Sequence, residues 1–145
     1  MNFNYFKRIQ MMLLIIAAFG LNRQQMFSLL KQMFQMPQEQ SLELLEYLVK
    51  EHNSLFFQVL NQLNTEQQVV VNAADNGKYH LAAKFMLLGC NNLVDGRRSF
   101  DLLTEFQKEK VSLHYTILCN EQVSLMKESG RKWKKSECFH FGDRY

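Results

Sequence analysis

Proline and glycine are scarce in this chain: Pro37 is the only proline among 145 residues, and there are six glycines. An all-β sandwich or barrel needs many short strands joined by turns that are rich in these two residues. The scarcity therefore excludes such folds and favours helices. Hydrophobic residues make up 47% of the chain, which is enough for a substantial core and excludes a disordered chain.

Cysteine content and net charge are also low. The three cysteines are an odd number, lie far apart and form no Cys-x-x-Cys pair, so they predict reduced, buried thiols in a cytosolic setting. A net charge of +3 is too small to indicate nucleic acid binding by itself. The length of 145 residues allows one domain or a short row of stacked repeats.

The longest apolar run is Met11–Phe19, which follows Lys7 and Arg8. A basic start, an apolar stretch and then small residues at Ala18 and Gly20 resemble a secretory signal. The run is too short to span a membrane, which takes about 20 residues. Because helical periodicity continues directly after the run, we predict a core helix there and keep a secreted or membrane-anchored protein as the alternative.

Apolar residues recur at helical spacing along the whole chain, and short breaks divide them into segments. Cap and turn signals set the expected boundaries: Asn22, Ser41 and a capping box from Thr65 to Gln68 begin helices, and Asn76-Gly77 and Gly89 end them. The expected helices are Met11–Phe19, Arg23–Met36, Leu42–Lys50, Leu55–Leu63, Glu66–Asp75, Lys78–Leu88, Phe100–Lys108 and Val111–Met126.

Short helices joined by short breaks predict an all-α fold built as a short stack of helix-turn-helix hairpins. A compact, irregular helical domain is the alternative. We expect one domain over residues 1–126, followed by a basic, aromatic tail over residues 127–145.

The most specific pattern lies between Asn72 and Asn91. It consists of Ala73-Ala74, Asp75, Asn76-Gly77, a second helix with Lys84 before Leu87-Leu88, and a closing Gly89-Cys90-Asn91. Small alanines allow close helix packing, Asn-Gly makes a tight turn, and the closing glycine suits a left-handed cap. The pattern resembles the body of an ankyrin repeat, and the resemblance extends from Asn72 to Leu103.

Weaker echoes lie on both sides of this segment. Ala17-Ala18 before Met26 repeats the layout, and Phe106, Leu113, Ile117 and Asn120 occupy corresponding places further on. The family's Thr-Pro-Leu-His motif occurs nowhere in the chain. The resemblance implies stacked hairpins that bind a protein through a concave face, formed by outward loops and inner helices.

Residues for catalysis or metal binding form no standard motif. His80 and His114 would lie one repeat apart and could line a common surface, although ordinary polar helix positions are the simpler interpretation. Cys138 with His140, or His114 with Cys119, could supply metal ligands, but their spacings match no zinc module. The chain lacks a Gly-rich phosphate loop, Gly-x-Ser-x-Gly and His-Glu-x-x-His. We therefore expect no enzyme activity, no cofactor and no metal.

The tail contains a tryptophan inside a basic cluster, formed by Arg131, Lys132, Trp133, Lys134 and Lys135. Such a cluster suits an anionic membrane or nucleic acid phosphates, and we keep a binder of this kind as an alternative function. A solubilising C-terminus explains the cluster more simply, because acidic residues surround it. Neither nucleic acid nor a membrane is therefore our expected partner.

We predict a non-catalytic protein-binding scaffold whose partner is another protein. The expected contact residues are Asn91, Asn92, Val94, Arg97 and Arg98 in one loop, with Asn76 and Lys78 at the preceding turn. We expect the apolar Met11–Phe19 helix to be covered either by the C-terminal tail or by another copy of the chain, so a homodimer through this end is a further hypothesis. A composition rich in Phe, Asn, Lys, Gln and Ile suggests an AT-rich genome. A small ankyrin-like protein from such a genome resembles a host-directed effector of an intracellular bacterium, either cytoplasmic or delivered into a host cell, and a viral or protist origin fits equally well.

Reversing both loop charges, Arg97→Glu with Arg98→Glu, should weaken partner binding without unfolding the chain, because both arginines lie in an expected surface loop. A pull-down titration measures this effect. Unchanged affinity would exclude the loop as the interface.

Overall fold

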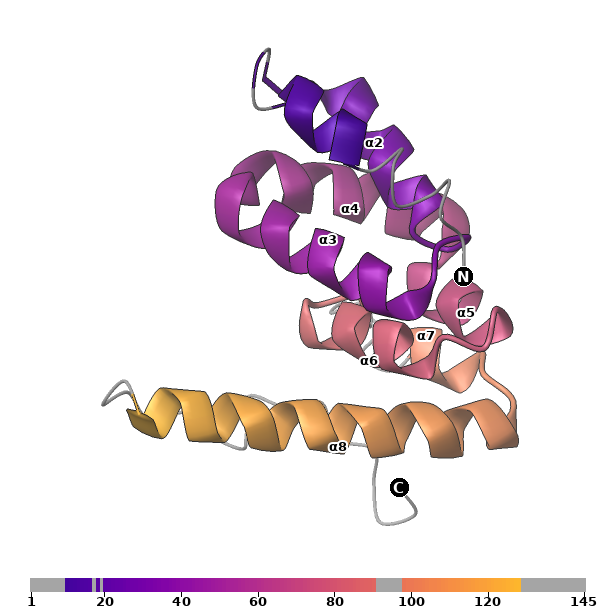
Figure 1. Ribbon diagram of the computed structural model, residues 1–145. Coiled ribbons are helices and arrows are strands. Elements are labelled where there is room, and N and C mark those ends of the chain that lie inside the picture. Colours follow the sequence, from indigo (N-terminus) through magenta and orange to yellow (C-terminus); the bar gives the residue numbers. More distant parts are fainter. Residues whose placement is uncertain (1–9, 17, 19, 91–97, 129–145) are drawn as a thin grey trace. The chain divides into compact units, whose positions relative to one another are not determined.

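The computed structural model describes residues 10–16, 18, 20–90 and 98–128. Every regular element in these residues is an α-helix and none is a strand, which confirms the predicted all-α class (Figure 1). The chain divides into two compact units, Met1–Glu66 and Gln67–Tyr145. The segment predicted as one domain, residues 1–126, includes residues of both units.

The first unit contains α2 (Arg23–Gln32), α3 (Gln38–Glu51) and most of α4 (Asn53–Gln67), and residues 10–16 before them are also helical. The predicted cap of α2 is confirmed: Asn22 Oδ1 accepts a hydrogen bond from the Gln25 amide at 2.8 Å, and Gln25 Oε1 accepts one from the Asn22 amide at 3.0 Å. Each side chain thus satisfies a backbone donor that the first helical turn leaves unpaired.

Ser41 does not begin a helix as predicted. Helix α3 already begins at Gln38, directly after Pro37, where proline's fixed backbone suits a helix start. Ser41 is buried inside α3, and its hydroxyl donates to the Met33 carbonyl at 2.7 Å. The side chain has the chemistry of a cap, but here it satisfies a carbonyl just beyond α2.

The predicted capping box from Thr65 to Gln68 is also wrong. Helix α4 continues through Gln67, and the Thr65 hydroxyl donates backwards to the Asn61 carbonyl at 3.0 Å. The break comes at Gln68, whose φ of +49° is left-handed. Apolar residues four and three apart keep α4 helical up to this point, because its buried side includes Phe56, Val59, Leu60 and Leu63.

The second unit contains α5 (Val69–Asp75), α6 (Tyr79–Leu87), α7 (Arg98–Asp101) and α8 (Glu105–Glu128). Helix α6 packs against both α5 and α8, and α5 also contacts α7. The predicted glycine turns are confirmed: Gly77, between α5 and α6, has a φ of +72°, and Gly89, after α6, has a φ of +99°. Only glycine adopts such angles without strain, so these two positions define the α5–α6 hairpin.

The prediction of two helices, Phe100–Lys108 and Val111–Met126, is wrong. Helix α8 is a single helix of 24 residues, and the four-residue α7 lies just before it. A capping box sets its start: Thr104 Oγ1 accepts from the Gln107 amide at 3.1 Å, and Gln107 Oε1 accepts from the Thr104 amide at 2.9 Å. The Gln107 side chain also donates to Asp75 Oδ1 at 2.8 Å, which ties the start of α8 to the end of α5.

Replacing the cap, Thr104→Ala, should lower the free energy of unfolding by about 1 kcal/mol, because the α8 amide that it satisfies loses its acceptor. Thr104→Ser keeps the hydroxyl and should leave the stability close to that of the wild type. Denaturant titration followed by circular dichroism measures both. Equal losses in the two variants would contradict the capping role.

Candidate functional site

Helix α8 has apolar residues on two opposite sides. Val111, Tyr115 and Leu118 are buried on the side that faces the rest of the second unit. They recur at i, i+4 and i+7, so they form one stripe along the helix. Because α6 packs against α8, this stripe fixes the rotation of α8 about its own axis. The opposite side must then face solvent.

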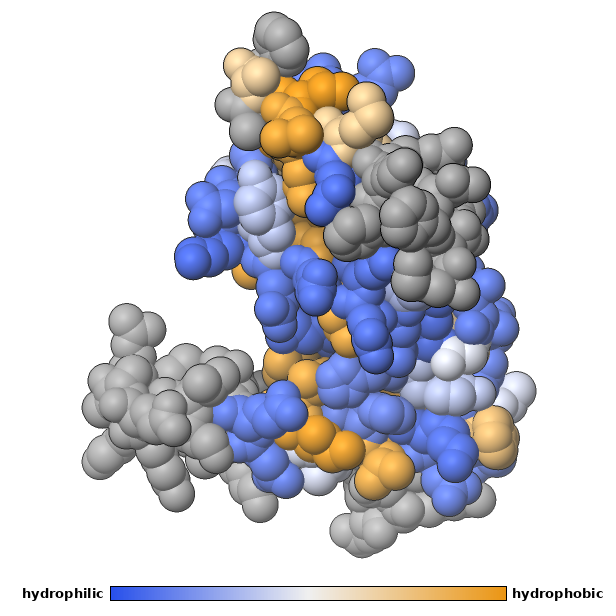
Figure 2. Space-filling view, in the orientation of Figure 1, coloured by the Kyte–Doolittle hydropathy of each residue, from blue (hydrophilic) through white to orange (hydrophobic). Residues whose placement is uncertain are grey.

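The solvent side carries a second apolar stripe. Phe106, Leu113 and Ile117 expose 59%, 58% and 42% of their surface, and Leu102, just before α8, exposes 54%. Figure 2 shows hydrophobic side chains at the surface over this helix, between hydrophilic ones. Isolated exposed apolar residues are ordinary, but a continuous stripe on one helix face is typical of an interaction surface.

Phe106 is held in position although it is exposed. Its ring meets the ring of Tyr79, from α6, edge to face at a centroid distance of 6.2 Å. The Lys110 ammonium lies 5.4 Å from the centre of the same ring, within the range of a cation–π contact. These two contacts give the exposed ring a defined position.

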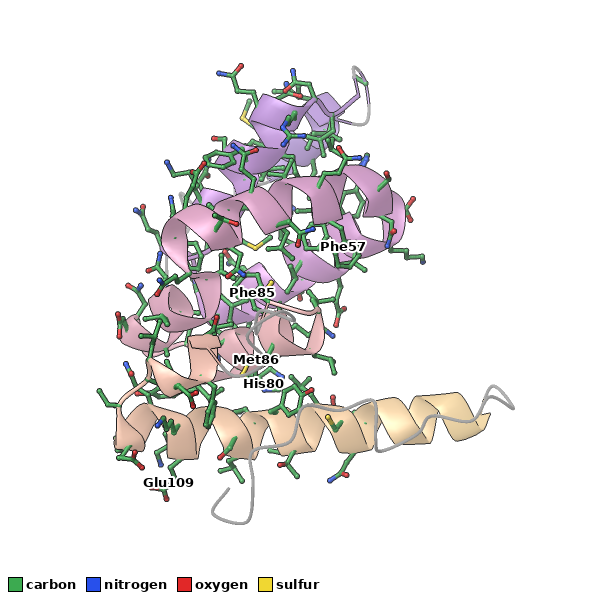
Figure 3. The ribbon with its side chains drawn as sticks, turned by 180° about the vertical axis from the view of Figure 1, so that it is seen from behind. Phe57, His80, Phe85, Met86 and Glu109 are labelled. Carbon is green, nitrogen blue, oxygen red and sulfur yellow. The ribbon has the colours of Figure 1, made fainter. Side chains whose placement is uncertain are left out.

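Charged residues border the exposed stripe. Glu105 and Glu109 are four residues apart, so they lie on one edge of it, and Glu109 projects from α8 on the side away from α6 (Figure 3). Lys108 reaches back to Glu105 with a nitrogen–oxygen distance of 3.5 Å and also lies over the Phe100 ring. The edge thus combines one paired and one further exposed carboxylate.

Two histidines meet between α6 and α8. Nδ1 of His80 lies 3.1 Å from Nδ1 of His114, and the two rings are nearly perpendicular (Figure 3 labels His80). At this distance one nitrogen donates its hydrogen to the lone pair of the other, so at least one of the two must be unprotonated at Nδ1. The simpler interpretation, separate polar positions on two helices, is therefore wrong, because the two side chains are in direct contact.

The surroundings of His80 disfavour its charged form. Partial burial is the largest cause that lowers the pKa of His80, and the neighbouring His114 and Lys84 lower it further. Glu121, two turns beyond His114 on α8, acts in the opposite direction and raises this pKa. The balance is a pKa below the ordinary value for histidine, which favours the neutral form that the hydrogen bond requires.

A further titratable group of the second unit is the thiol of Cys90, which is buried. Burial raises the pKa of the Cys90 thiol to about 12, so this thiol stays protonated and unreactive. The described part of the chain contains no group of three or more His, Cys, Asp or Glu residues that could hold a metal ion.

Two of the predicted contact residues lie at the α5–α6 turn. Asn76 is exposed, but its amide donates to the carbonyl of Asn72 at 2.8 Å and to its side-chain oxygen at 3.0 Å, so it closes the end of α5. Lys78 is partly buried, and this burial lowers the pKa of its ammonium. The Asn76 side chain thus has a structural role at the turn, where the Lys78 backbone amide also donates to the Ala73 carbonyl at 2.9 Å.

Most of the other predicted contacts lie in segments that the structure does not describe. Asn91, Asn92, Val94 and Arg97, and the whole basic cluster from Arg131 to Lys135, lie outside the described residues. Arg98 is the first residue of α7. The predicted loop interface therefore stays a prediction.

The predicted apolar surface near the N-terminus is present. Met11, Leu14 and Ile15 are exposed on the helical residues 10–16, whereas Ile16 is buried. The Gly20 amide donates to the Ile16 carbonyl at 2.8 Å, and this hydrogen bond closes the last helical turn. Gly20 itself has a left-handed φ of +86°. None of the helices in the described residues combines the length and the apolar character that crossing a bilayer requires.

Sequence reasoning missed the exposed stripe of α8. These three residues, Phe106, Leu113 and Ile117, were assigned to a weak repeat, because the expected break near residue 110 divided the continuous helix into two. The pattern Thr104-x-x-Gln107 is the signal that could have revealed it, since it marks a helix start. A helix drawn from that point separates these residues from Val111 and Tyr115 on the opposite face.

Comparison of the chain with protein-family models, with curated proteins and with solved structures finds no match.

The lowered pKa of His80 predicts that stability falls in mild acid. Between the folded-state pKa and the unfolded value near 6.5, the unfolded chain binds more protons, so the free energy of unfolding decreases as the pH falls through this window. The contribution of one histidine cannot exceed about 1.4 kcal/mol per pH unit. Denaturant titrations between pH 7.5 and about pH 5 measure this slope.

His80→Gln should reduce the slope, because glutamine does not titrate. His52→Gln, in the first unit, is the matched control and should keep the wild-type slope. An unchanged slope in the His80 variant would show that the contact does not control acid stability.

Proposed function

We propose that this chain is a non-catalytic, helical protein-binding module, and that the outer face of α8 receives the partner. The exposed stripe of Phe106, Leu113 and Ile117 is the observation that supports this proposal most directly. Aromatic and large aliphatic residues, bordered by charged ones, are the composition of the centre of a protein interface. The rigid contacts of Phe106 add to it, because a side chain that is already ordered loses less entropy on binding.

The proposed family character is that of a degenerate ankyrin-like repeat centred on the α5–α6 hairpin. Its helices are short, with seven and nine residues, and they are joined through the Asn76-Gly77 turn. Gly89 ends the second helix in a left-handed conformation. These features support the resemblance between Asn72 and Leu103. In the first unit, α3 and α4 have 14 and 15 residues, so the support comes from the second unit.

The arrangement of the titratable groups favours binding over catalysis. The two histidines bond to each other, and Cys90 is buried with a raised pKa. Neither arrangement holds a base beside an available nucleophile. An interaction module needs none, and the exposed stripe suits that role.

Replacing two residues of the stripe, Leu113→Asp with Ile117→Asp, should abolish partner capture, because the interface would then bury two carboxylates without counterions. The expected loss of affinity is more than about 30-fold, as for hot-spot residues. The measurement is quantitative affinity capture from cell extract with the full chain, wild type against variant.

Ser54→Asp with Gln58→Asp is the matched control, since both positions are exposed in the first unit and lie four residues apart on one helix. The control should retain the captured proteins. Thermal unfolding should change little in either variant, because every altered side chain is exposed. Proteins retained equally by the stripe variant and the wild type would refute the outer face of α8 as the interface.

A further inference from the structure

We infer that the partner element of this face is an amphipathic α-helix with an apolar side and basic residues along one edge. The inference rests on the proposed function and adds the class of the partner. It follows from three properties of α8: the backbone that it offers, the shape of its stripe, and the charge along its border.

The backbone of α8 excludes recognition by strand addition. An extended peptide gains affinity when it pairs with an open sheet edge, and no strand occurs in the described residues. The amide and carbonyl groups inside a helix are already hydrogen-bonded to one another, so α8 offers none to an extended chain. A helical partner satisfies its own backbone and needs only side-chain contacts from α8.

The shape of the stripe suits a second helix. Phe106, Leu113 and Ile117 stand at i, i+7 and i+11, with the Lys110 stem between the first two. This is a straight ridge of three turns, about 16 Å long. An antiparallel partner helix with apolar residues at i, i+4 and i+11 presents a ridge of the same spacing, and ridges of this kind pack into each other's grooves.

The charge along the border selects a basic partner. Glu105 and Glu109 line one edge of the stripe, and Glu121 is exposed further along the helix. Lys108 reaches Glu105, so the edge meets a partner chiefly through the Glu109 carboxylate, and Lys110, over the Phe106 ring, lies toward the other border of the stripe. The chain as a whole carries +3, so the acidic edge is a local feature. Lysine or arginine residues four apart on a partner helix would face it.

The same edge disfavours a second copy of α8 as the partner. A two-fold, antiparallel pairing of two α8 helices would place the edge with Glu105 and Glu109 against itself. Like charges at that position oppose association. The acidic edge therefore acts against self-pairing and in favour of a basic helix.

Two labelled peptides test the inference against the full chain. Both are helices of about 15 residues with leucines at i, i+4, i+7 and i+11; one has lysines along an edge, and the other has glutamates at the same positions. Fluorescence anisotropy gives both affinities. We expect the lysine peptide to bind about fivefold more tightly, and the difference to shrink in high salt.

Glu109→Lys should reverse this preference, because it changes the sign of the edge without touching the apolar stripe. Glu43→Lys, on the exposed surface of α3, makes the same change in net charge and should leave the preference as in the wild type. Leu113→Asp with Ile117→Asp should abolish binding of both peptides. These four proteins separate the charge of the edge from the apolar contact.

Each of the other possible outcomes would refute one specific claim. Equal affinities that Glu109→Lys does not change would refute the basic edge and leave the proposed function standing. Failure of both peptides, with cellular partners still captured through the stripe, would refute the helical partner. Light scattering that shows a dimer dissociated by Leu113→Asp would assign the face to a second copy. Loss of both peptide binding and partner capture would refute the proposed function itself.

Discussion

The burial of one side of α8 is the constraint on which the second unit depends. Val111, Tyr115 and Leu118 are withdrawn from water, and α6 packs against this helix. A helix is rigid about its axis, so burying one stripe fixes where every other side chain of α8 points. The capping box at Thr104 sets the residue at which the helix begins. The exposed apolar stripe is a consequence of the orientation that this burial fixes.

Because of the contact between His80 and His114, the packing of α6 on α8 depends on a protonation state as well as on apolar burial. Both rings are partly exposed at the border of α6 and α8, and their hydrogen bond requires an unprotonated nitrogen. Apolar burial is insensitive to protons, whereas this contact is not. The two kinds of interaction lie on the same pair of helices, so the support of the outer face of α8 includes a histidine whose pKa is lowered by burial.

Caps and turns were predicted correctly where residues nearby in the sequence complete them. Asn22 caps α2 through Gln25, three residues away, and Gly77 supplies a backbone angle that its own turn demands. Ser41 and Thr65 were misread because a hydroxyl can bond to several backbone groups, and its choice depends on what the fold leaves unpaired. Ser41 meets the carbonyl of Met33, and Thr65 bonds back into α4, where apolar burial keeps the helix continuous.

The sequence by itself determined that this protein is helical, where its tightest turns lie, and that the stretch around Asn76-Gly77 forms a hairpin of short helices. These properties follow from composition, periodicity and residues with special backbone freedom, all of which act over a few positions. Only the tertiary structure decided which side of α8 is buried and that His80 touches His114. Helix α8 has apolar residues on both sides, so its periodicity fits either orientation, and contact with a helix distant in sequence is what selects one.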